Sequence, residues 1–188
     1  MTRDYLAILD ACVLVPAGLR DTLLRLAETP RLYVPKWSEE ILAEVERTLV
    51  RKLGKTKEQA AYLIGQLTCA FPESVVKECQ SIEAALNNHE KDRHVLAAAI
   101  GCSAQTIVTF NLKHFPADIL KQYDVEPLHP DEFLVNQFYL DDALVTKRFT
   151  EQATAVNRNV EDQLAAFHQT RVLPLFTQTM AEALGVKL

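Results

Sequence analysis

The sequence of 188 residues lacks several features that would place it in a special class of protein. It has no run of about 18 apolar residues, so no membrane-spanning helix is predicted. Its four cysteines form no C-x-x-C pair, which argues against a disulfide framework or a zinc site made by cysteine. At the N-terminus, Arg3 and Asp4 precede only a short apolar stretch, whereas a signal peptide needs a longer one. We therefore expect a cytoplasmic protein with reduced thiols and no membrane association.

Basic residues are fewer than acidic ones, with 20 Lys and Arg against 25 Asp and Glu. The net charge of -5 would not attract nucleic acid, so any such binding has to use a local basic patch. The densest candidate is a basic cluster made of Arg47, Arg51, Lys52, Lys55 and Lys57. This cluster is interpreted either as solvated surface or as a contact to phosphate groups.

Apolar residues make up 48% of the chain, which predicts a globular core. Strand patterns alternate with helix patterns up to residue 128; the strands are expected at 5–9, 31–34, 74–78, 105–110 and 125–128, and the helices at 14–27, 38–53, 56–71, 92–100 and 117–122. This alternation predicts an α/β fold with a central, mostly parallel sheet and helices on both faces.

No strand pattern recurs after Pro130. The remaining chain divides into helical runs that break near residues 140–141, 157–159 and 171–174. We therefore expect an α/β domain over residues 1–129 and an all-helical C-terminal extension over residues 130–188, packed on that domain.

Polar residues follow two of the predicted strands. Asp10 comes directly after the first strand, Asn111 ends the fourth, and Asp92 opens an alanine-rich helix. The carboxyl ends of parallel strands open toward one edge of a sheet, so these side chains are expected to converge. Carboxylates that converge need a divalent cation, and hard oxygen ligands select Mg²⁺ or Mn²⁺. The alternative is structural, because Asp is also typical of turns and helix N-caps.

A further acid comes from the second predicted helix. On a helical wheel, Glu44 and Glu46 border opposite edges of its apolar stripe, so geometry leaves open which of them turns inward. Ser38 begins this helix, where it serves either as an N-cap or as a polar group of the site.

Four motifs occur in order along the chain: Asp10-Ala11-Cys12-Val13-Leu14, Trp37-Ser38-x-x-Ile41-x-x-Glu44, Asp92-Arg93-His94-Val95-Leu96-Ala97-Ala98-Ala99 and Thr109-Phe110-Asn111-Leu112-Lys113-His114-Phe115-Pro116. Together they resemble the PIN-domain nucleases, and within them the VapC-like ribonuclease toxins that carry a helical C-terminal extension. The segment from His129 to Leu134 resembles the same branch.

The resemblance implies a PIN-like α/β/α sandwich and a metal-dependent endoribonuclease, the toxin of a type II toxin–antitoxin pair. It selects Glu44 over Glu46 and implies that Asp10, Glu44 and Asp92 hold Mg²⁺ or Mn²⁺, which activates water for hydrolysis of an RNA phosphodiester. Asn111 would position the water or the phosphate. The candidates for positioning substrate or water are Ser38, Arg93, Lys113 and His114. An RNA substrate, a cognate antitoxin and a homodimer are implied as partners.

The chain also departs from the family pattern. Relatives often carry aspartates just before the residue that matches Asp92 and in the turn after the fourth strand, where this chain has His89-Glu90-Lys91 and His114. The loss of negative charge predicts weaker metal binding. An alternative function is therefore a PIN-like binding module that acts through protein contacts without cleavage. A phospho-acceptor role for Asp10 is disfavoured, because Cys12 stands where such hydrolases carry a second aspartate.

Overall fold

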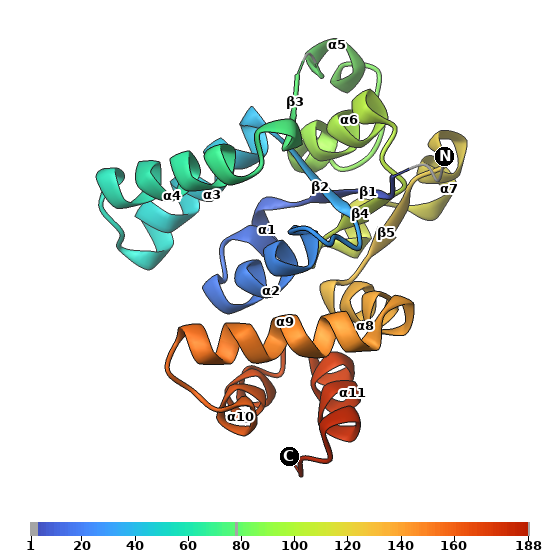
Figure 1. Ribbon diagram of the computed structural model, residues 1–188. Coiled ribbons are helices and arrows are strands. Elements are labelled where there is room, and N and C mark those ends of the chain that lie inside the picture. The colour runs from blue at the N-terminus through green and yellow to red at the C-terminus, as the bar shows by residue number, and fades with distance from the viewer. Residues whose placement is uncertain (1–3, 78, 188) are drawn as a thin grey trace. The chain divides into compact units, whose positions relative to one another are not determined.

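A five-stranded parallel sheet forms the centre of the first part of the chain (Figure 1). Its strands lie in the order β3-β2-β1-β4-β5. Their bounds are β1 Leu6–Leu9, β2 Val34–Ser38, β3 Val75–Val76, β4 Thr106–Val108 and β5 Glu126–Leu128. The predicted α/β class with a parallel sheet is therefore confirmed, and β5 is an edge strand as expected.

The computed structural model describes residues 4–77 and 79–187 and divides into two compact units. The first unit consists of Met1–Pro16 and Tyr33–Leu128, and the second of Ala17–Leu32 and His129–Leu188. The second unit therefore combines a segment from near the N-terminus with the C-terminal helices. The division at residue 129 stays a prediction, as does the packing of the extension on the α/β domain.

Helices of the first unit flank the sheet. They are α1 Ala11–Leu14, α3 Glu39–Leu53, α4 Lys57–Ala70, α5 Gln80–Glu83, α6 Arg93–Cys102 and α7 Ala117–Leu120, with 3₁₀ turns η1 Pro72–Ser74, η2 Glu90–Asp92, η3 Leu112–His114 and η4 Lys121–Tyr123. Helix α6 contacts β1, β2, β3 and β4. Its residues Ala97, Ala98 and Ala99 are fully buried, because small side chains allow a helix to approach a sheet closely.

Local signals set the ends of α3 and α4. The Ser38 hydroxyl accepts a hydrogen bond from the backbone N–H of Ile41, and Gly54 ends α3 at a φ of 64°, where glycine is favoured. Thr56 and Gln59 form the expected capping box at the start of α4. Between the two helices, the chain turns and exposes most of the basic cluster.

Two predicted elements differ from the structure, and proline accounts for both. The helix expected at 14–27 is split into α1 and α2, because Pro16 lies in its path. The strand expected at 31–34 instead begins at Val34 and runs through Pro35 to Ser38 as β2. Proline has no backbone N–H to donate. It is tolerated at position 35 because β2 pairs with β3 only from Trp37 onward, so no strand yet lies on the side of β2 where residue 35 would donate.

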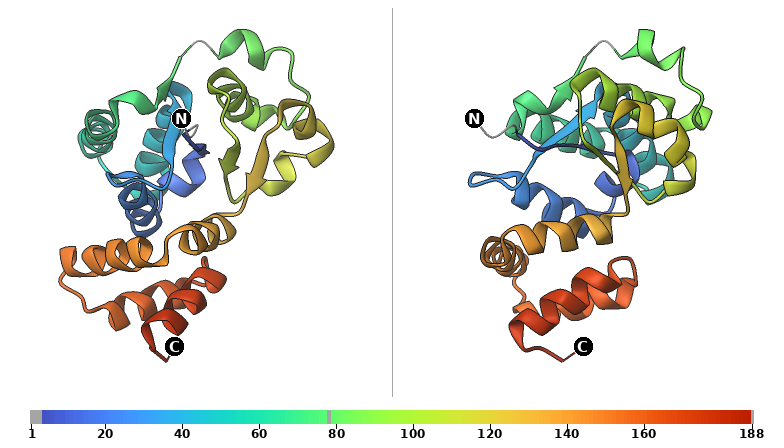
Figure 2. Two further views of the ribbon diagram at one scale, coloured as in Figure 1. Left: turned by 45° about the vertical axis from the view of Figure 1, so that its right-hand side comes forward. Right: turned by 90° about the vertical axis from the view of Figure 1, so that its right-hand side faces the viewer.

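The second unit contains helices alone among its described elements. They are α2 Ala17–Ala27, α8 Pro130–Leu140, α9 Asp142–Ala155, α10 Val160–Thr170 and α11 Pro174–Leu184, with breaks where the sequence predicts them. Helices α2 and α9 lie side by side (Figure 2), joined by a buried hydrogen bond of 2.8 Å from Thr22 Oγ1 to Gln152 Oε1. Within the described residues, every helix is too short or too polar to cross a lipid bilayer.

Candidate functional site

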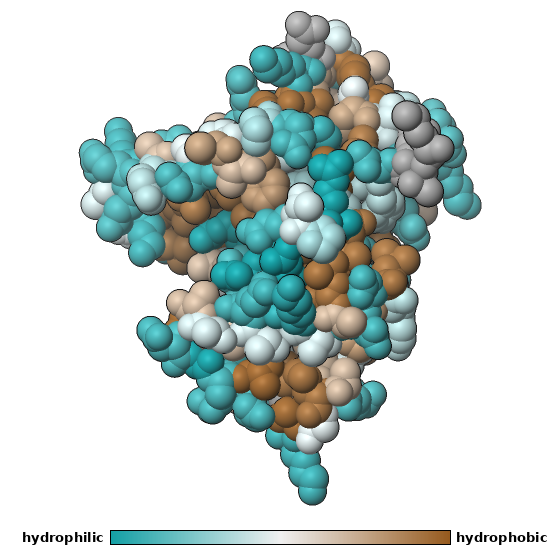
Figure 3. All heavy atoms as spheres, viewed as in Figure 1, coloured by the Kyte–Doolittle hydropathy of each residue, from teal (hydrophilic) through white to brown (hydrophobic). Residues whose placement is uncertain are grey.

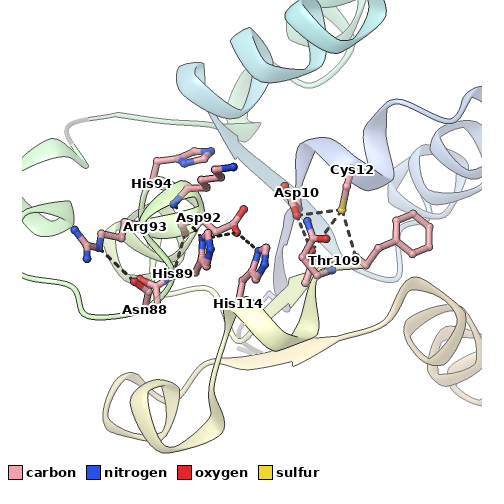
Figure 4. A network of polar contacts seen from close by, with 12 residues as sticks. Asp10, Cys12, Asn88, His89, Asp92, Arg93, His94, Thr109 and His114 are labelled. Atoms are coloured by element: carbon pink, nitrogen blue, oxygen red, sulfur yellow. Dashed lines mark hydrogen bonds and ion pairs between the residues drawn. The ribbon is translucent and has the colours of Figure 1, made fainter. Parts of the chain in front are cut away.

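Asp10 lies at the carboxyl end of β1 and is 1% exposed. It occupies the N-cap position of α1, yet its side chain makes no capping hydrogen bond. Instead, its Oδ2 atom accepts hydrogen bonds from Thr109 Oγ1 at 2.6 Å and from Cys12 Sγ at 3.1 Å (Figure 4). The register explains the first contact: Leu9 pairs with Val108, so the residues that follow them, Asp10 and Thr109, are neighbours.

Among the described residues, Asp10 forms no ion pair with a lysine or an arginine. Burial raises the pKa of its carboxyl, and the nearby carboxylates of Asp92 and Glu44 raise it further, although the hydrogen bonds from Thr109 and Cys12 oppose this. Burial and the charge of Asp10 raise the pKa of the Cys12 thiol. Cys12 therefore stays protonated, and its S–H group donates a hydrogen bond to Asp10. Asp92 and Glu44 thus lie near enough for their charges to act on Asp10, but among the described residues the oxygen atoms of the three acids do not all come within 4.8 Å of one another.

Asp92 is the last residue of η2 and directly precedes α6, and 6% of its surface is exposed. It occupies the N-cap position of α6, but here too the side chain makes no capping hydrogen bond. His114 Nδ1 donates to Asp92 Oδ2 at 2.5 Å, and His89 Nδ1 lies 3.9 Å from the same oxygen. Asp92 is therefore paired with His114, toward which its carboxylate turns (Figure 4), whereas Nδ1 of His89 accepts a hydrogen bond from the backbone N–H of Lys91.

Glu44 projects from α3 and lies with Oε2 3.5 Å from Nε2 of His94 on α6. This contact lowers the pKa of Glu44, and the positive charges of Arg47 and Lys52 lower it further, against the effect of burial. Burial alone would lower the pKa of His94, but the carboxylates of Glu44, Glu40 and Asp10 together raise it. The Glu44 carboxylate is therefore ionised and faces both His94 and the basic part of α3.

A pocket of about 580 Å³ adjoins Glu44 and His94. Four cationic side chains line it together with these two residues, namely Arg47, Arg51, Lys52 and Lys91. Hydrophilic residues cover the joint of α3 and α4 on the face seen in Figure 3. Asp10 and Asp92 are not among the described residues that line this pocket, so Glu44 connects it to the buried acids.

The remaining predicted residues differ in their relation to these acids. Ser38 caps α3, as the structural alternative expected. Asn111 follows Thr109 and donates its backbone N–H to Thr109 Oγ1, while its side chain caps nothing. Arg93 Nε donates to the backbone carbonyl of Asn88 at 3.3 Å, and Lys113 is exposed on η3. Among these residues the structure pairs Asp92 with His114, whereas Glu44 contacts His94 and Asp10 contacts Thr109 and Cys12.

The donor set fits a divalent cation. Asp10 and Asp92 are buried acids, and within the described residues neither forms an ion pair with a lysine or an arginine. Oxygen donors of this kind suit Mg²⁺ and Mn²⁺, and such an ion would relieve the repulsion that raises the pKa of Asp10. Asp10, Glu44 and Asp92 are the residues that would hold it.

Four contributors to this region were given no role by the sequence: Cys12, His89, His94 and Thr109. Thr109 could have been inferred from strand alternation, because it stands two residues before Asn111 at the end of β4. His94 lies two positions after Asp92 on α6, a spacing that does not by itself predict a contact with Glu44. The approach of His89 to His114 joins residues 25 positions apart and had no local signal.

An α/β fold with a parallel sheet and converging acids at the carboxyl ends of its strands is consistent with the PIN fold. In sequence, the chain is 63% identical over 57 residues to a protein of Mycobacterium tuberculosis named "Putative ribonuclease VapC50". The match covers 30% of this chain and spans about a third (34%) of that relative's length. The resemblance to VapC-like ribonucleases is thus confirmed over the matched segment. No family model and no solved structure matches the chain.

Proposed function

We propose that this protein is a metal-dependent endoribonuclease of the VapC type and the toxin of a toxin–antitoxin pair. The observation that carries the proposal is the buried carboxylate of Asp10 at the carboxyl end of β1, whose pKa is raised first by burial and then by the charges of Asp92 and Glu44. The partial identity with a VapC-named ribonuclease supports the same reaction class.

The side chains have separate roles in this proposal. A divalent cation held by Asp10, Glu44 and Asp92 would supply the Lewis acid that activates water and offsets phosphate charge. Thr109 and the Cys12 thiol fix the carboxylate of Asp10 through hydrogen bonds. Asn111, which follows β4 by three residues and makes no side-chain capping hydrogen bond, would orient water or the scissile phosphate.

In this proposal, RNA approaches the acids along the part of the pocket that Arg47, Arg51 and Lys52 line on α3, although Glu40, Glu83 and Glu90 line the same pocket. Arg47 and Arg51 stand one helical turn apart on α3, on the same pocket as Glu44. A strand whose scissile phosphate reaches the acids would lay its neighbouring phosphates along these guanidinium groups. This local arrangement allows a chain of net charge -5 to bind a polyanion.

The test is cleavage of single-stranded and structured RNA by purified protein with Mg²⁺ or Mn²⁺. We expect cleavage by the wild type, its loss in Asp10→Asn, and wild-type cleavage by Asp118→Asn, a matched change at an exposed aspartate on α7. Thermal melting checks that each variant folds. Equal cleavage by Asp10→Asn would point to a contaminating nuclease. A folded wild type that binds both metal and RNA without cutting would leave a binding module as the better description.

A further inference from the structure

His89, Asp92 and His114 form a second cluster of possible metal ligands beside the acids. One donor atom from each lies within 4.8 Å of the other two. Asp92 Oδ2 is the common point, because Nδ1 of His114 and Nδ1 of His89 lie 2.5 Å and 3.9 Å from it. Asp10 and Glu44 do not belong to this cluster.

Backbone hydrogen bonds hold the three residues together independently of their side-chain contacts. The N–H of His89 donates to the carbonyl of His114, and the N–H of Asp92 donates to the carbonyl of His89. The side-chain amide of Asn88, itself 3% exposed, donates to the carbonyl of Asp92 at 3.2 Å. Two separate loops are thereby fixed so that their donors face one another, as a metal site requires.

The chemistry of these donors differs from that of the three acids. Carboxylate oxygens suit Mg²⁺ and Mn²⁺, whereas imidazole nitrogens suit Fe²⁺, Co²⁺, Ni²⁺ and Zn²⁺, and two histidines with one carboxylate are a known ligand set for such ions. We propose that His89, Asp92 and His114 bind a divalent transition-metal ion. This site is additional to the acidic one and shares Asp92 with it.

Binding requires two small rearrangements. First, ligand atoms that bind one ion through bonds of about 2.1 Å lie roughly 3 to 3.5 Å apart, so the distances between the three donor atoms have to change. Second, the ion replaces the proton that lies between His114 and Asp92, and this proton is released to the solvent. The imidazole rings are stacked with centroids 4.0 Å apart and an angle of 14°, so their in-plane lone pairs do not converge. His89, with 41% of its side chain exposed against 21% for His114, is the ring with room to turn.

The test is metal binding by tag-free wild-type protein, because a polyhistidine tag would bind the same ions. Titration calorimetry with Zn²⁺ and Mg²⁺, together with the visible absorption of bound Co²⁺, measures affinity and ligand type. We expect His89→Ala and His114→Ala each to weaken Zn²⁺ and Co²⁺ binding at least about tenfold, and to weaken Mg²⁺ binding by a smaller factor. The control is His168→Ala on exposed α10, which should bind as the wild type does.

Folding and position are checked by further variants. His89→Asn and His114→Asn keep a polar side chain in place, and folded forms of these variants should show the same loss. Asp10→Asn should retain Co²⁺ absorption, because Asp10 is not a ligand of this cluster. Unchanged Zn²⁺ and Co²⁺ affinity in the folded histidine variants would overturn the proposal, as would loss of the Co²⁺ spectrum in Asp10→Asn.

This inference and the proposed nuclease fail separately. If the protein cleaves RNA with Mg²⁺ but its Zn²⁺ affinity does not depend on either histidine, only the transition-metal site is refuted. Zn²⁺ and Co²⁺ binding that depends on His89 and His114, in a protein that never cuts RNA, would refute only the nuclease.

Discussion

Asp10 and Asp92 are both buried acids of the first unit, and they are held in opposite ways. Asp10 receives hydrogen bonds from the neutral groups of Thr109 and Cys12, on a frame of two paired strands. Asp92 contacts two imidazoles from loops, which are able to carry positive charge. Both stand at helix N-caps without capping, so neither carboxylate is used by the helix that follows it.

The difference indicates what each carboxylate needs from a ligand. Neutral donors fix the position of Asp10 but leave its charge uncompensated, which is why burial and neighbouring acids raise its pKa. A divalent cation removes that cost. Asp92 differs in that its Oδ2 atom contacts Nδ1 of an imidazole, that of His114, at 2.5 Å. We therefore expect the Asp10 end to depend more strongly on metal for its stability than the Asp92 end.

The largest expected effect tests how the hydrogen bond from Thr109 holds Asp10 in position. Thr109→Val removes the 2.6 Å hydrogen bond at nearly constant volume, and we expect RNA cleavage to fall about 10- to 100-fold because Asp10 loses its orientation. Thr109→Ser keeps the hydroxyl and should restore most of the rate. Cleavage rates at saturating metal measure the effect. Equal rates for the Val and Ser variants would show that this hydrogen bond does not position Asp10.

A smaller effect is expected at the basic wall of the pocket. Arg47→Ala with Arg51→Ala should weaken binding of uncleaved RNA to an Asp10→Asn background by about tenfold at low salt, because two phosphate contacts are lost. The slope of log affinity against log salt should fall by about 1.4, at roughly 0.7 per phosphate of a single strand. Lys121→Ala with Lys147→Ala removes the same charge elsewhere and is the control. Equal losses in both pairs would mean that only net charge matters.

The smallest expected effect is on stability without metal. A buried carboxyl with a raised pKa is harder to ionise in the folded than in the unfolded protein, so its ionisation destabilises the fold as the pH rises above the ordinary value of 3.8. Asp10→Asn cannot ionise, and we expect a gain on the order of 1 kcal/mol at pH 7 that disappears toward pH 3. Urea unfolding in EDTA measures it, with Asp118→Asn as the control. If Asp10→Asn is less stable than the wild type at pH 7, ionisation of Asp10 does not destabilise the metal-free fold.

Much of the fold was predictable because its signals are local. The capping box at Thr56, the glycine that ends α3 and the helix breaks of the second unit all act within a few residues, and all lie where the sequence predicts them. The path of the chain around Pro35 was not predictable, because it depends on where β3 begins to pair with β2. A proline signal alone does not carry that information.

The candidate site divides in the same manner. Strand ends indicated Asp10 and Asn111, the start of the alanine-rich helix indicated Asp92, and the resemblance selected Glu44, although their roles as ligands stay predictions. The wheel for α3 could not choose between Glu44 and Glu46; the contact with His94 comes from a different helix and decides the direction of Glu44. The stacked histidines depend on two loops that only the folded chain brings together.

The alanine run of α6 has a consequence for how such a site can vary. Ala97, Ala98 and Ala99 are methyl-sized spacers between a rigid helix and the strands beneath it, and the same helix carries Asp92 at its start. Any larger residue in this run would lift the helix and change the gap between Asp92 and Asp10. The distance between the two carboxylates is therefore set by side chains that touch neither of them. Substitutions confined to the core would then change which ion the site prefers.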